Sequence, residues 1–292
     1  MKKFIILIPI YNDWQSAIKL LEEIDVQIAN WNSSVSILII NDASTQQKTT
    51  TEKIFKNIKS VKIMNMKKNQ GHARCYATAL KYIVEKEDFD YAIPMDGDGE
   101  DRPEELNLLF KKANENPLKT ITADRVKRSE GWFFKLLYES HKALTFIFTG
   151  KLIKFGNYSF LTKETVVKLT KEPSIWSSFS GTLTKIVSNR ISVPSIRGNR
   201  YFGLSKMNFF DLLLHSLSIM AVFKEIVIIR SLTFLVFYIF FIFNYFSIVT
   251  LFPVIIILIF LFLIIKISTR ANIYELNNSF QNIDNLDSFD SR

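Results

Sequence analysis

Apolar runs alternate with segments of helical spacing along the first third of the chain. A short apolar run bounded by turn residues predicts a buried strand, and apolar positions three and four residues apart predict a helix. These patterns predict strands over 4–10, 36–40, 61–66 and 91–95, and helices over 16–28, 50–58 and 71–85. Strands that alternate with helices indicate an α/β fold with a mostly parallel sheet flanked by helices.

A second strong pattern is an apolar segment near the end of the chain. Residues 231–265 carry no charged side chain. One helix of that length would measure about 52 Å, which exceeds the roughly 30 Å of a bilayer's hydrocarbon core. The segment therefore predicts a hairpin of two spans over 231–266, with Asn244 and Pro253 available for the turn. The alternative, a hairpin buried in a soluble protein, is disfavoured because Phe, Ile and Leu occupy every face.

The charges around this segment predict its orientation. Lys224 and Arg230 precede it, and Lys266 and Arg270 follow it. Basic residues on both sides favour a hairpin whose two ends lie in the cytoplasm. The start of the chain has no signal-peptide pattern. We therefore expect a cell-membrane protein with two spans, in which residues 1–206 form a cytoplasmic domain.

Two further segments complete the predicted organisation. Residues 207–230 predict an amphipathic helix with a polar stripe of Asn208, Asp211, His215 and Ser218. Such a helix either lies in the membrane interface or packs on the domain, and its position beside the hairpin favours the interface. Residues 267–292, which are rich in Asn, Asp and Ser, predict a disordered tail.

Composition and charge narrow the classes of function. Apolar residues make up 48% of the 292 positions, which excludes global disorder. The single cysteine, Cys75, excludes a disulfide framework and a Cys-rich zinc site. Of the net charge of +9, residues 119–154 (eight basic, three acidic) and 185–230 (seven basic, two acidic) each carry +5. We interpret these basic segments as contacts for membrane lipids or a phosphate-bearing substrate. No nucleic-acid partner is expected, because the chain has no nucleic-acid-binding motif.

Polar clusters follow all four predicted strands, at 11–13, 41–42, 69–74 and 96–104. Because parallel strands share one carboxyl edge, where ligands bind, the clusters predict a single site. Asp96 and Asp98 are two residues apart, so they can point the same way, with Glu100 next. Such carboxylates suit Mg²⁺ or Mn²⁺. The alternative is an acidic turn, since the segment does not complete a calcium-binding loop.

Four of these segments carry recognisable motifs. They are Ile8-Pro9-Ile10-Tyr11-Asn12, Ile40-Asn41-Asp42-Ala43-Ser44, Asn69-Gln70-Gly71-His72-Ala73 and Asp96-Gly97-Asp98. In order and spacing they resemble family 2 glycosyltransferases, which have a GT-A fold and use nucleotide-diphosphate sugars. Residues 101–104 and 200–206 further resemble segments of the polyprenol-phosphate sugar transferases, the dolichol-phosphate mannose synthase-like branch of that family.

The resemblance implies roles for the matched positions. The nucleotide sugar would be held by Pro9, Tyr11, Asp13, Asp42, Gly71 and Asp96. The metal, Mg²⁺ or Mn²⁺, would be held by Asp96, Asp98 and Glu100. Arginine forks match phosphate oxygens, so the basic segments supply the acceptor candidates Arg125, Arg128, Ser129, Arg200, Ser205 and Lys206. The expected catalytic residues are Asp98, Arg125, Arg128, Arg200 and Lys206.

These features together predict a membrane-anchored, metal-dependent enzyme that moves one sugar to a polyprenyl phosphate at the cytoplasmic face. The branch commonly carries G-D-F-R after the acceptor region, where this chain has Gly156-Asn157-Tyr158-Ser159. A glycan or another non-phosphate acceptor is therefore an alternative. A non-catalytic membrane scaffold is a second alternative, which the intact Asp96 and Asp98 oppose. The patterns leave open whether the chain forms a homo-oligomer.

Overall fold

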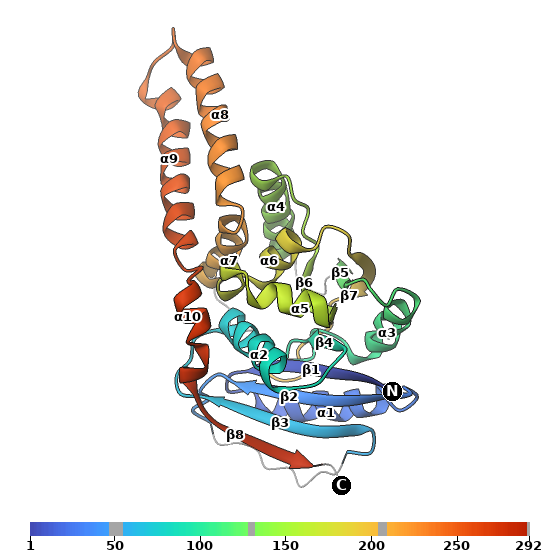
Figure 1. Ribbon diagram of the computed structural model, residues 1–292. Helices are drawn as coiled ribbons and strands as arrows, with labels where there is room; N and C mark the ends of the chain where they lie inside the picture. Colours follow the sequence, from blue (N-terminus) through green and yellow to red (C-terminus); the bar gives the residue numbers. More distant parts are fainter. Residues whose placement is uncertain (47–54, 128–131, 204–208, 291–292) are drawn as a thin grey trace.

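The computed structural model describes residues 1–46, 55–127, 132–203 and 209–290. Within these residues, eight strands form one sheet in the order β7-β5-β6-β4-β1-β2-β3-β8 (Figure 1). The strands are β1 (Lys2–Ile10), β2 (Ser33–Asn41), β3 (Ile58–Met66), β4 (Tyr91–Pro94), β5 (Ile121–Lys127), β6 (Phe155–Thr162), β7 (Ile191–Ile196) and β8 (Ile283–Asp290).

Helices connect these strands and extend beyond them. The α-helices are α1 (Trp14–Gln27), α2 (His72–Lys86), α3 (Leu106–Glu115), α4 (Trp132–Thr149), α5 (Lys163–Thr170), α6 (Phe179–Ile186), α7 (Phe209–Ala221), α8 (Lys224–Ile242), α9 (Ile248–Ser268) and α10 (Ile273–Asn277). Short 3₁₀ helices lie at η1 (Pro103–Glu105), η2 (Pro173–Trp176) and η3 (Ser279–Asn282).

The central strands run parallel to one another. β1 pairs in parallel with β2 and β4, and β2 pairs in parallel with β3. β6 is antiparallel to β4 and β5, whereas β7 is parallel to β5. The predicted α/β fold with a mostly parallel sheet is confirmed. Its parallel part brings the carboxyl ends of β1 to β4 to one edge, where ligands bind in such sheets.

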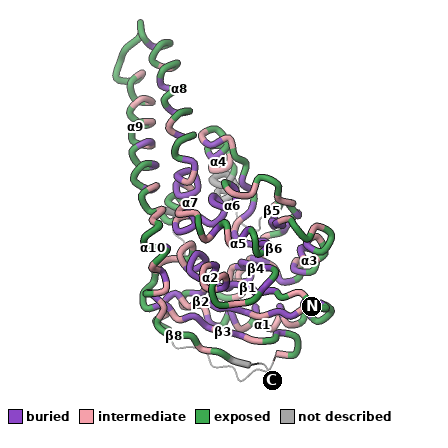
Figure 2. Tube along the Cα trace, in the orientation of Figure 1, coloured by how far each residue is buried: buried purple, intermediate pink, exposed green. Residues whose placement is uncertain are grey.

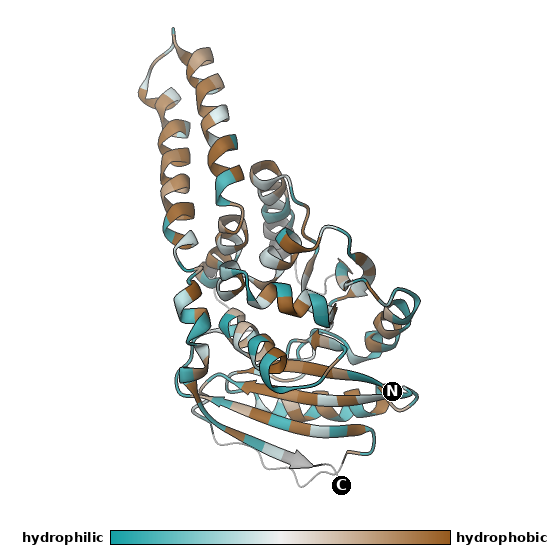
Figure 3. Ribbon diagram, viewed as in Figure 1, coloured by the Kyte–Doolittle hydropathy of each residue, from teal (hydrophilic) through white to brown (hydrophobic). Residues whose placement is uncertain are grey.

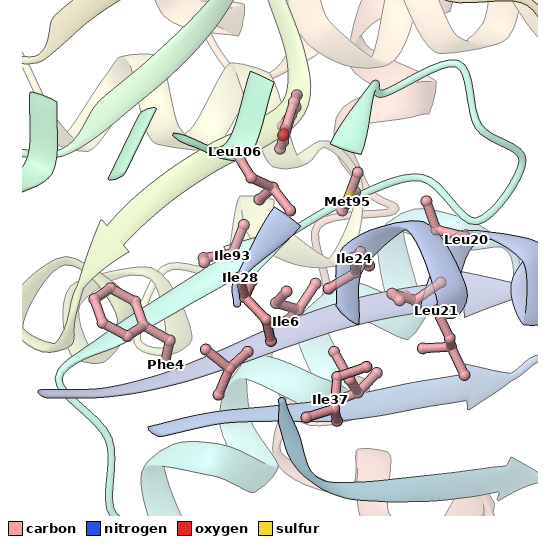
Figure 4. Close-up of a cluster of buried hydrophobic side chains, with 14 of the residues drawn as sticks. Phe4, Ile6, Leu20, Leu21, Ile24, Ile28, Ile37, Ile93, Met95 and Leu106 are labelled. Atoms are coloured by element: carbon pink, nitrogen blue, oxygen red, sulfur yellow. The ribbon is translucent and has the colours of Figure 1, made fainter. Parts of the chain in front are cut away.

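Alternate residues of β1 face two separate cores. Phe4, Ile6 and Ile8 pack with α1 and α3, and Figure 4 shows part of this cluster. Ile5 and Leu7 pack with α2, α5 and α6 on the other face. A strand that is covered on both faces has an uninterrupted apolar sequence. This burial, shown in Figure 2, explains the apolar run at 4–10.

The predicted helix over 50–58 is wrong where the structure describes it. Residues 55–57 are irregular and Ile58 begins β3, while 50–54 lie outside the described residues. The reason is a side chain from α1. The Asp25 carboxylate accepts hydrogen bonds from the backbone amides of Lys56, Asn57 and Ile58 at 3.1, 2.8 and 2.8 Å. These amides therefore bond to Asp25 instead of forming a helical turn.

The prediction of a disordered tail over 267–292 is also wrong for the described part. α9 continues to Ser268, α10 follows, and β8 pairs antiparallel with β3. Leu276 of α10 is fully buried in the core beside α2. β8 satisfies backbone groups at the edge of β3 that would otherwise lack partners. Because this edge strand is largely exposed, it needs few apolar residues, and its polar composition resembles that of a disordered segment.

α8 and α9 form a hairpin that projects from the rest of the chain (Figure 1). Both helices are long and apolar enough to cross a membrane, and Figure 3 shows that most of their residues are hydrophobic. The Ser247 side chain caps α9, so the turn lies before it and includes Asn244, whereas Pro253 lies inside α9. Segment 207–230, predicted as one helix, is divided between α7 and the start of α8.

Candidate active site

Two turns at the carboxyl ends of β1 and β2 are tied together. Asn12 and Ala43 adopt the left-handed region, with φ of 51° and 57°. Asn12 Oδ1 accepts from the amides of Thr45 at 2.8 Å and Gln46 at 3.0 Å, and Ser44 Oγ accepts from the Asn12 amide at 2.8 Å. Such conformations in non-glycine residues persist where the surrounding structure fixes them, often at functional sites. The two strand ends therefore form one rigid rim.

Asp42 organises the loop that leads into α2. Its carboxylate is only 3% exposed and accepts the amides of Gln70 at 2.9 Å and Gly71 at 2.8 Å. Gly71 has φ of 87°, a conformation that glycine adopts without the steric cost of a side chain. In the structure Asp42 therefore positions Gly71. Its contact with a nucleotide stays a prediction.

Asp96, directly after β4, lies in a polar cluster with side chains from α2 and β6. His72 Nε2 and Tyr76 Oη lie 3.1 and 3.3 Å from Asp96 Oδ1. Asn157 Nδ2 donates to the same oxygen at 3.0 Å and lies 2.8 Å from His72 Nε2. Burial lowers the pKa of His72, but the hydrogen bond and charge of Asp96 outweigh it and raise that pKa. The cluster therefore holds the Asp96 carboxylate in one orientation.

Arg200 joins the acidic loop to the end of β1. Its Nη1 donates to Asp98 at 2.6 Å and its Nη2 donates to Asp13 at 2.5 Å. The three side chains are each 16–17% exposed, so this ion pair is better shielded than a surface pair. The Tyr201 amide donates to the Asp98 carbonyl at 2.9 Å. The Tyr201 ring covers Gly99, where an added Cβ would lie 2.5 Å from it. Segment 197–203 is therefore held over the acidic loop.

Two other arginines pair with the rest of the loop. Arg125 of β5 lies 3.9 Å from Asp96 and 3.8 Å from Asp101, and it is 15% exposed. Arg197 pairs with Glu100. Burial raises the pKa of Asp96, but its hydrogen bond with His72 and the charges of His72, Arg125 and Arg197 hold that pKa below its usual range.

The loop concentrates negative charge despite these arginines. Burial, together with the charges of Asp96 and Glu100, raises the pKa of Asp98 to about 6. Burial and the charge of Asp96 raise the pKa of Asp101 to about 7. Burial disfavours any charge, whereas the contribution of the neighbouring carboxylates to these shifts is the part that favours a cation at this position.

The carboxylates of the acidic loop match the predicted metal site in part. Asp96 and Asp98 supply the hard oxygens that Mg²⁺ or Mn²⁺ requires, and the concentration of negative charge fits a divalent ion. Glu100 does not join them, because it is directed toward Arg197. Among the described residues, no three Asp, Glu, His or Cys side chains are gathered as metal ligands. The donor set therefore fits a metal through two of its three predicted ligands.

Helices on the hairpin side border this cluster. The protein atoms around His215 of α7 lower the pKa of its imidazole to about 4. The positive charges of His72, His141 and Arg125 lower it further, whereas the charge of Asp96 raises it. His215 itself is exposed. Tyr76, whose hydroxyl lies 3.3 Å from Asp96, shares a buried cluster with Ile219 of α7, and α7 contacts α4.

The C-terminal segment contacts the start of α2. Glu275 of α10 accepts from Trp176 Nε1 at 2.7 Å and lies 3.3 Å from Arg74. The Arg74 guanidinium also lies 5.3 Å from the centre of the Trp176 ring, which favours a cation–π interaction. α10 therefore links the end of the hairpin to the helix that carries His72.

The structure brings most of the predicted site residues to one edge of the sheet. The charged cluster contains Asp13, Asp96, Asp98, Arg125 and Arg200. Pro9 and Tyr11 lie at and just beyond the end of β1, with Tyr11 40% exposed. The predicted residues that lie outside the described part of the chain are Arg128, Ser129, Ser205 and Lys206. Their roles stay predictions.

Sequence reasoning leaves several members of the cluster unassigned. Tyr76 has a detectable signal, because it lies four residues after His72 and therefore on the same face of a helix. Asn157 stands where the related branch carries an acid, but nothing local indicates its contact with Asp96, and Arg197 has no local signal. Both reach the acidic loop because β6 pairs with β4 and β5, and because β7 pairs with β5.

Comparisons with known proteins identify the family and the type of fold. Residues 5–189 match the family described as Glycosyl transferase family 2. Glucosyl-3-phosphoglycerate synthase from Mycobacterium tuberculosis, solved with Mn²⁺, UDP-glucose and phosphoglyceric acid, is similar with a TM-score of 0.52 and 10% identity, over 77% of this chain and 80% of that chain. This likeness supports the GT-A type of α/β fold.

Two other solved structures are more distant in shape. TarS 1–349 from S. aureus matches with a TM-score of 0.47 and 17% identity, over 77% of this chain and 71% of that chain. The mannosyltransferase PcManGT from Pyrobaculum calidifontis, solved with GDP-Man and Mn²⁺, matches with a TM-score of 0.46 and 13% identity, over 95% of this chain and 86% of that chain.

Proposed function

Since the chain belongs to glycosyl transferase family 2 and is a glycosyltransferase that uses a nucleotide-sugar donor, we propose that it transfers a single sugar to a polyprenyl phosphate. We also propose that the hairpin of α8 and α9 crosses the cell membrane and holds the active site at the cytoplasmic face. The apolar length of both helices and the basic residues on either side of the hairpin support this anchoring.

One observation carries the acceptor proposal, namely that the charged cluster is packed against the helix that leads into the hairpin. Tyr76, whose hydroxyl lies 3.3 Å from Asp96, belongs to the same buried cluster as Ile219 of α7. Only two residues separate α7 from α8. A phosphate on a membrane lipid would approach from this side and meet Arg125 there.

The chemistry requires positioning more than a strong base. A phosphate monoester is largely ionised near neutral pH, because its second pKa is about 6. Arg125, which is 15% exposed, is placed to hold the acceptor phosphate. Arg200 already presents two ordered donors to Asp13 and Asp98, and the same fork geometry suits phosphate oxygens.

We propose that Asp96 and Asp98 hold Mg²⁺ or Mn²⁺. When bound, the ion neutralises charge that develops on the leaving nucleoside diphosphate. In the structure Arg200 Nη1 donates to the Asp98 carboxylate at 2.6 Å. When the donor binds, Arg200 would therefore leave Asp98 and pair with a donor phosphate. The positive charge of Arg200 would then stay near the reacting groups.

A non-phosphate acceptor, such as a glycan, is a second candidate that a specific observation favours. Where the related branch carries an acid and an arginine, this chain has Asn157 and Ser159. Ser159 is fully buried and donates to the Asn157 carbonyl at 2.8 Å, so it supplies no charge to a phosphate. The amide of Asn157 donates to Asp96 and cannot act as a base.

The two acceptors are separated by product formation with the purified full chain in nanodiscs. UDP, GDP, CDP and dTDP sugars are each supplied with Mn²⁺ and either polyprenyl phosphate or sugar acceptors. We expect a lipid-linked sugar with one donor, lost with EDTA and in Asp98→Asn. The matched control is Asp88→Asn, because Asp88 is exposed and pairs with Lys3. Product on sugar acceptors alone would favour the second candidate, and no product with any pair would contradict both.

A further inference from the structure

Exposed apolar side chains gather on α4 and on the first half of α7. They are Leu144, Phe146 and Ile147 on α4, which are 47–59% exposed, and Leu213 and Leu214 on α7, which are 38–45% exposed. We call these five residues the α4–α7 face. The two helices contact each other and α8, and both lie at the base of the hairpin (Figure 1). Soluble surfaces rarely expose so many large apolar side chains together.

The other sides of these helices are already packed. On α4, Thr145 and Thr149 are buried, and the Phe148 ring centre lies 4.5 Å from that of Phe260 in α9. The second half of α7 packs against the hairpin through Leu217 and Met220. The α4–α7 face is therefore not required by the core, and it is open to an apolar partner.

α4 is fixed to the start of the hairpin. Arg230 Nη1 in α8 donates to the carbonyl oxygens of Phe146 at 3.3 Å and Ile147 at 2.7 Å. A cation at a helix C-terminus stabilises its unpaired carbonyl groups. Arg230 is also the last charged residue before the apolar segment at 231–265. The α4 end of the face is therefore level with the position where the hairpin becomes wholly apolar.

The surrounding charges fit an anionic lipid surface. The segments 119–154 and 185–230, which contain α4 and α7, are the two that each carry a net +5. Lys151 and Lys154 follow α4 and Lys224 begins α8, and all three are exposed. Large apolar side chains beside lysines are typical of helices that lie at the membrane interface.

We propose that the α4–α7 face lies at the boundary between the headgroups and acyl chains of the bilayer that the hairpin crosses. This inference rests on the proposed anchoring and extends it to α4, a helix that the sequence pattern does not single out. Contacts through the hairpin, α4 and α7 prevent the domain from pivoting on the hairpin alone. Arg125 and Asp96 are thereby held at a constant height, close to the phosphates of membrane lipids.

The test measures the depth of three sites with a fluorophore on introduced cysteines. Val236 (68% exposed) reports on the hairpin, Ile147 (59%) on α4, and Val26 (70%), on α1, is the matched control. The native Cys75 is buried, so labelling is directed to the introduced residue. The full chain is placed in phosphatidylcholine–phosphatidylglycerol nanodiscs whose acyl chains carry bromine, a contact quencher, at a shallow or a deep position.

We expect quenching at residues 147 and 236 and none at residue 26, with shallow bromine quenching residue 147 more strongly than deep bromine. Quenching at 236 without quenching at 147 would overturn the inference and leave the anchoring intact. No quenching at 236 would overturn both the anchoring and the inference, without bearing on sugar transfer, which is assayed separately. Cross-linking between copies through residue 147, with no bromine quenching there, would assign the face to a second copy and overturn the inference.

Discussion

Replacement of Arg200 by methionine tests the charged cluster directly. In the structure Arg200 competes with any metal for Asp98, because its guanidinium donates to that carboxylate at 2.6 Å and to Asp13 at 2.5 Å. Arg200→Met keeps much of the apolar stem and removes the charge. We expect Mn²⁺ alone to bind the variant more tightly than the wild type. We also expect sugar transfer to fall, because a cation near the phosphates is lost.

The magnitude follows from the geometry. Two unit charges about 4 Å apart interact by about 4 kcal/mol at an effective dielectric constant near 20. The side chains are 16–17% exposed, so water screens part of this interaction. Mn²⁺ also displaces Arg200 from Asp98 alone, because the pairing of Arg200 with Asp13 can remain. We therefore expect Mn²⁺ binding to strengthen by about 1–2 kcal/mol, or roughly five- to thirtyfold in Kd. Loss of the shared cation should lower the free energy of unfolding by about 1–3 kcal/mol.

The assay follows free Mn²⁺ by electron paramagnetic resonance as the full chain in detergent is titrated at pH 8 without nucleotide. This pH keeps Asp98 ionised, because its pKa is raised to about 6. Arg200 lowers that pKa, so its removal raises the value, and the gain in affinity should shrink as the pH falls toward it. Arg190→Met is the control, since the Arg190 guanidinium donates to the Val187 carbonyl at 3.2 Å. Unchanged or weaker Mn²⁺ binding in a folded Arg200→Met variant would refute Asp98 as a metal ligand.

Three further substitutions test other parts of the site and fold. Gly99→Ala should lower the free energy of unfolding by about 1–2 kcal/mol more than Gly203→Ala. Both glycines have positive φ, but only at Gly99 would the new Cβ meet a ring, at 2.5 Å. Equal losses in the two variants would argue against that ring contact. Leu276→Ala should cost about 2–4 kcal/mol of unfolding free energy, because the side chain is 0% exposed; a loss below 1 kcal/mol would indicate that α10 is not docked. Asn157→Asp places a carboxylate near Asp96, where the present amide is 3.0 Å away. The same amide lies 2.8 Å from His72 Nε2, so the new carboxylate should raise the pKa of His72, which Asp96 already raises, still further. The stability that protonated His72 provides is lost as the pH rises through that pKa, so the variant should lose more stability than the wild type between pH 5.5 and pH 8, and a melting temperature with the wild-type pH dependence would contradict this.

Local patterns were sufficient for the parts of the chain whose chemistry repeats over a few residues. The buried strands at 4–10 and 36–40 are apolar except for Ser36, because both faces of the sheet are covered. The apolar hairpin was visible because its surface carries no charge over 231–265. The residues that follow the strand ends were predictable as one site, since parallel strands place their carboxyl ends together.

Long-range pairing decided the rest. Arg200 reaches Asp98 across 102 positions of the chain, and Asn157 reaches Asp96 across 61; no local pattern specifies either contact. The tail became a strand because the edge of β3 offered unpaired backbone groups, and backbone hydrogen bonding makes few demands on side chains. The sequence alone therefore determined the elements with a repeated apolar pattern and the presence of polar residues at the strand ends. Only the tertiary structure decided which charges face one another, because such contacts depend on how distant strands and helices pack.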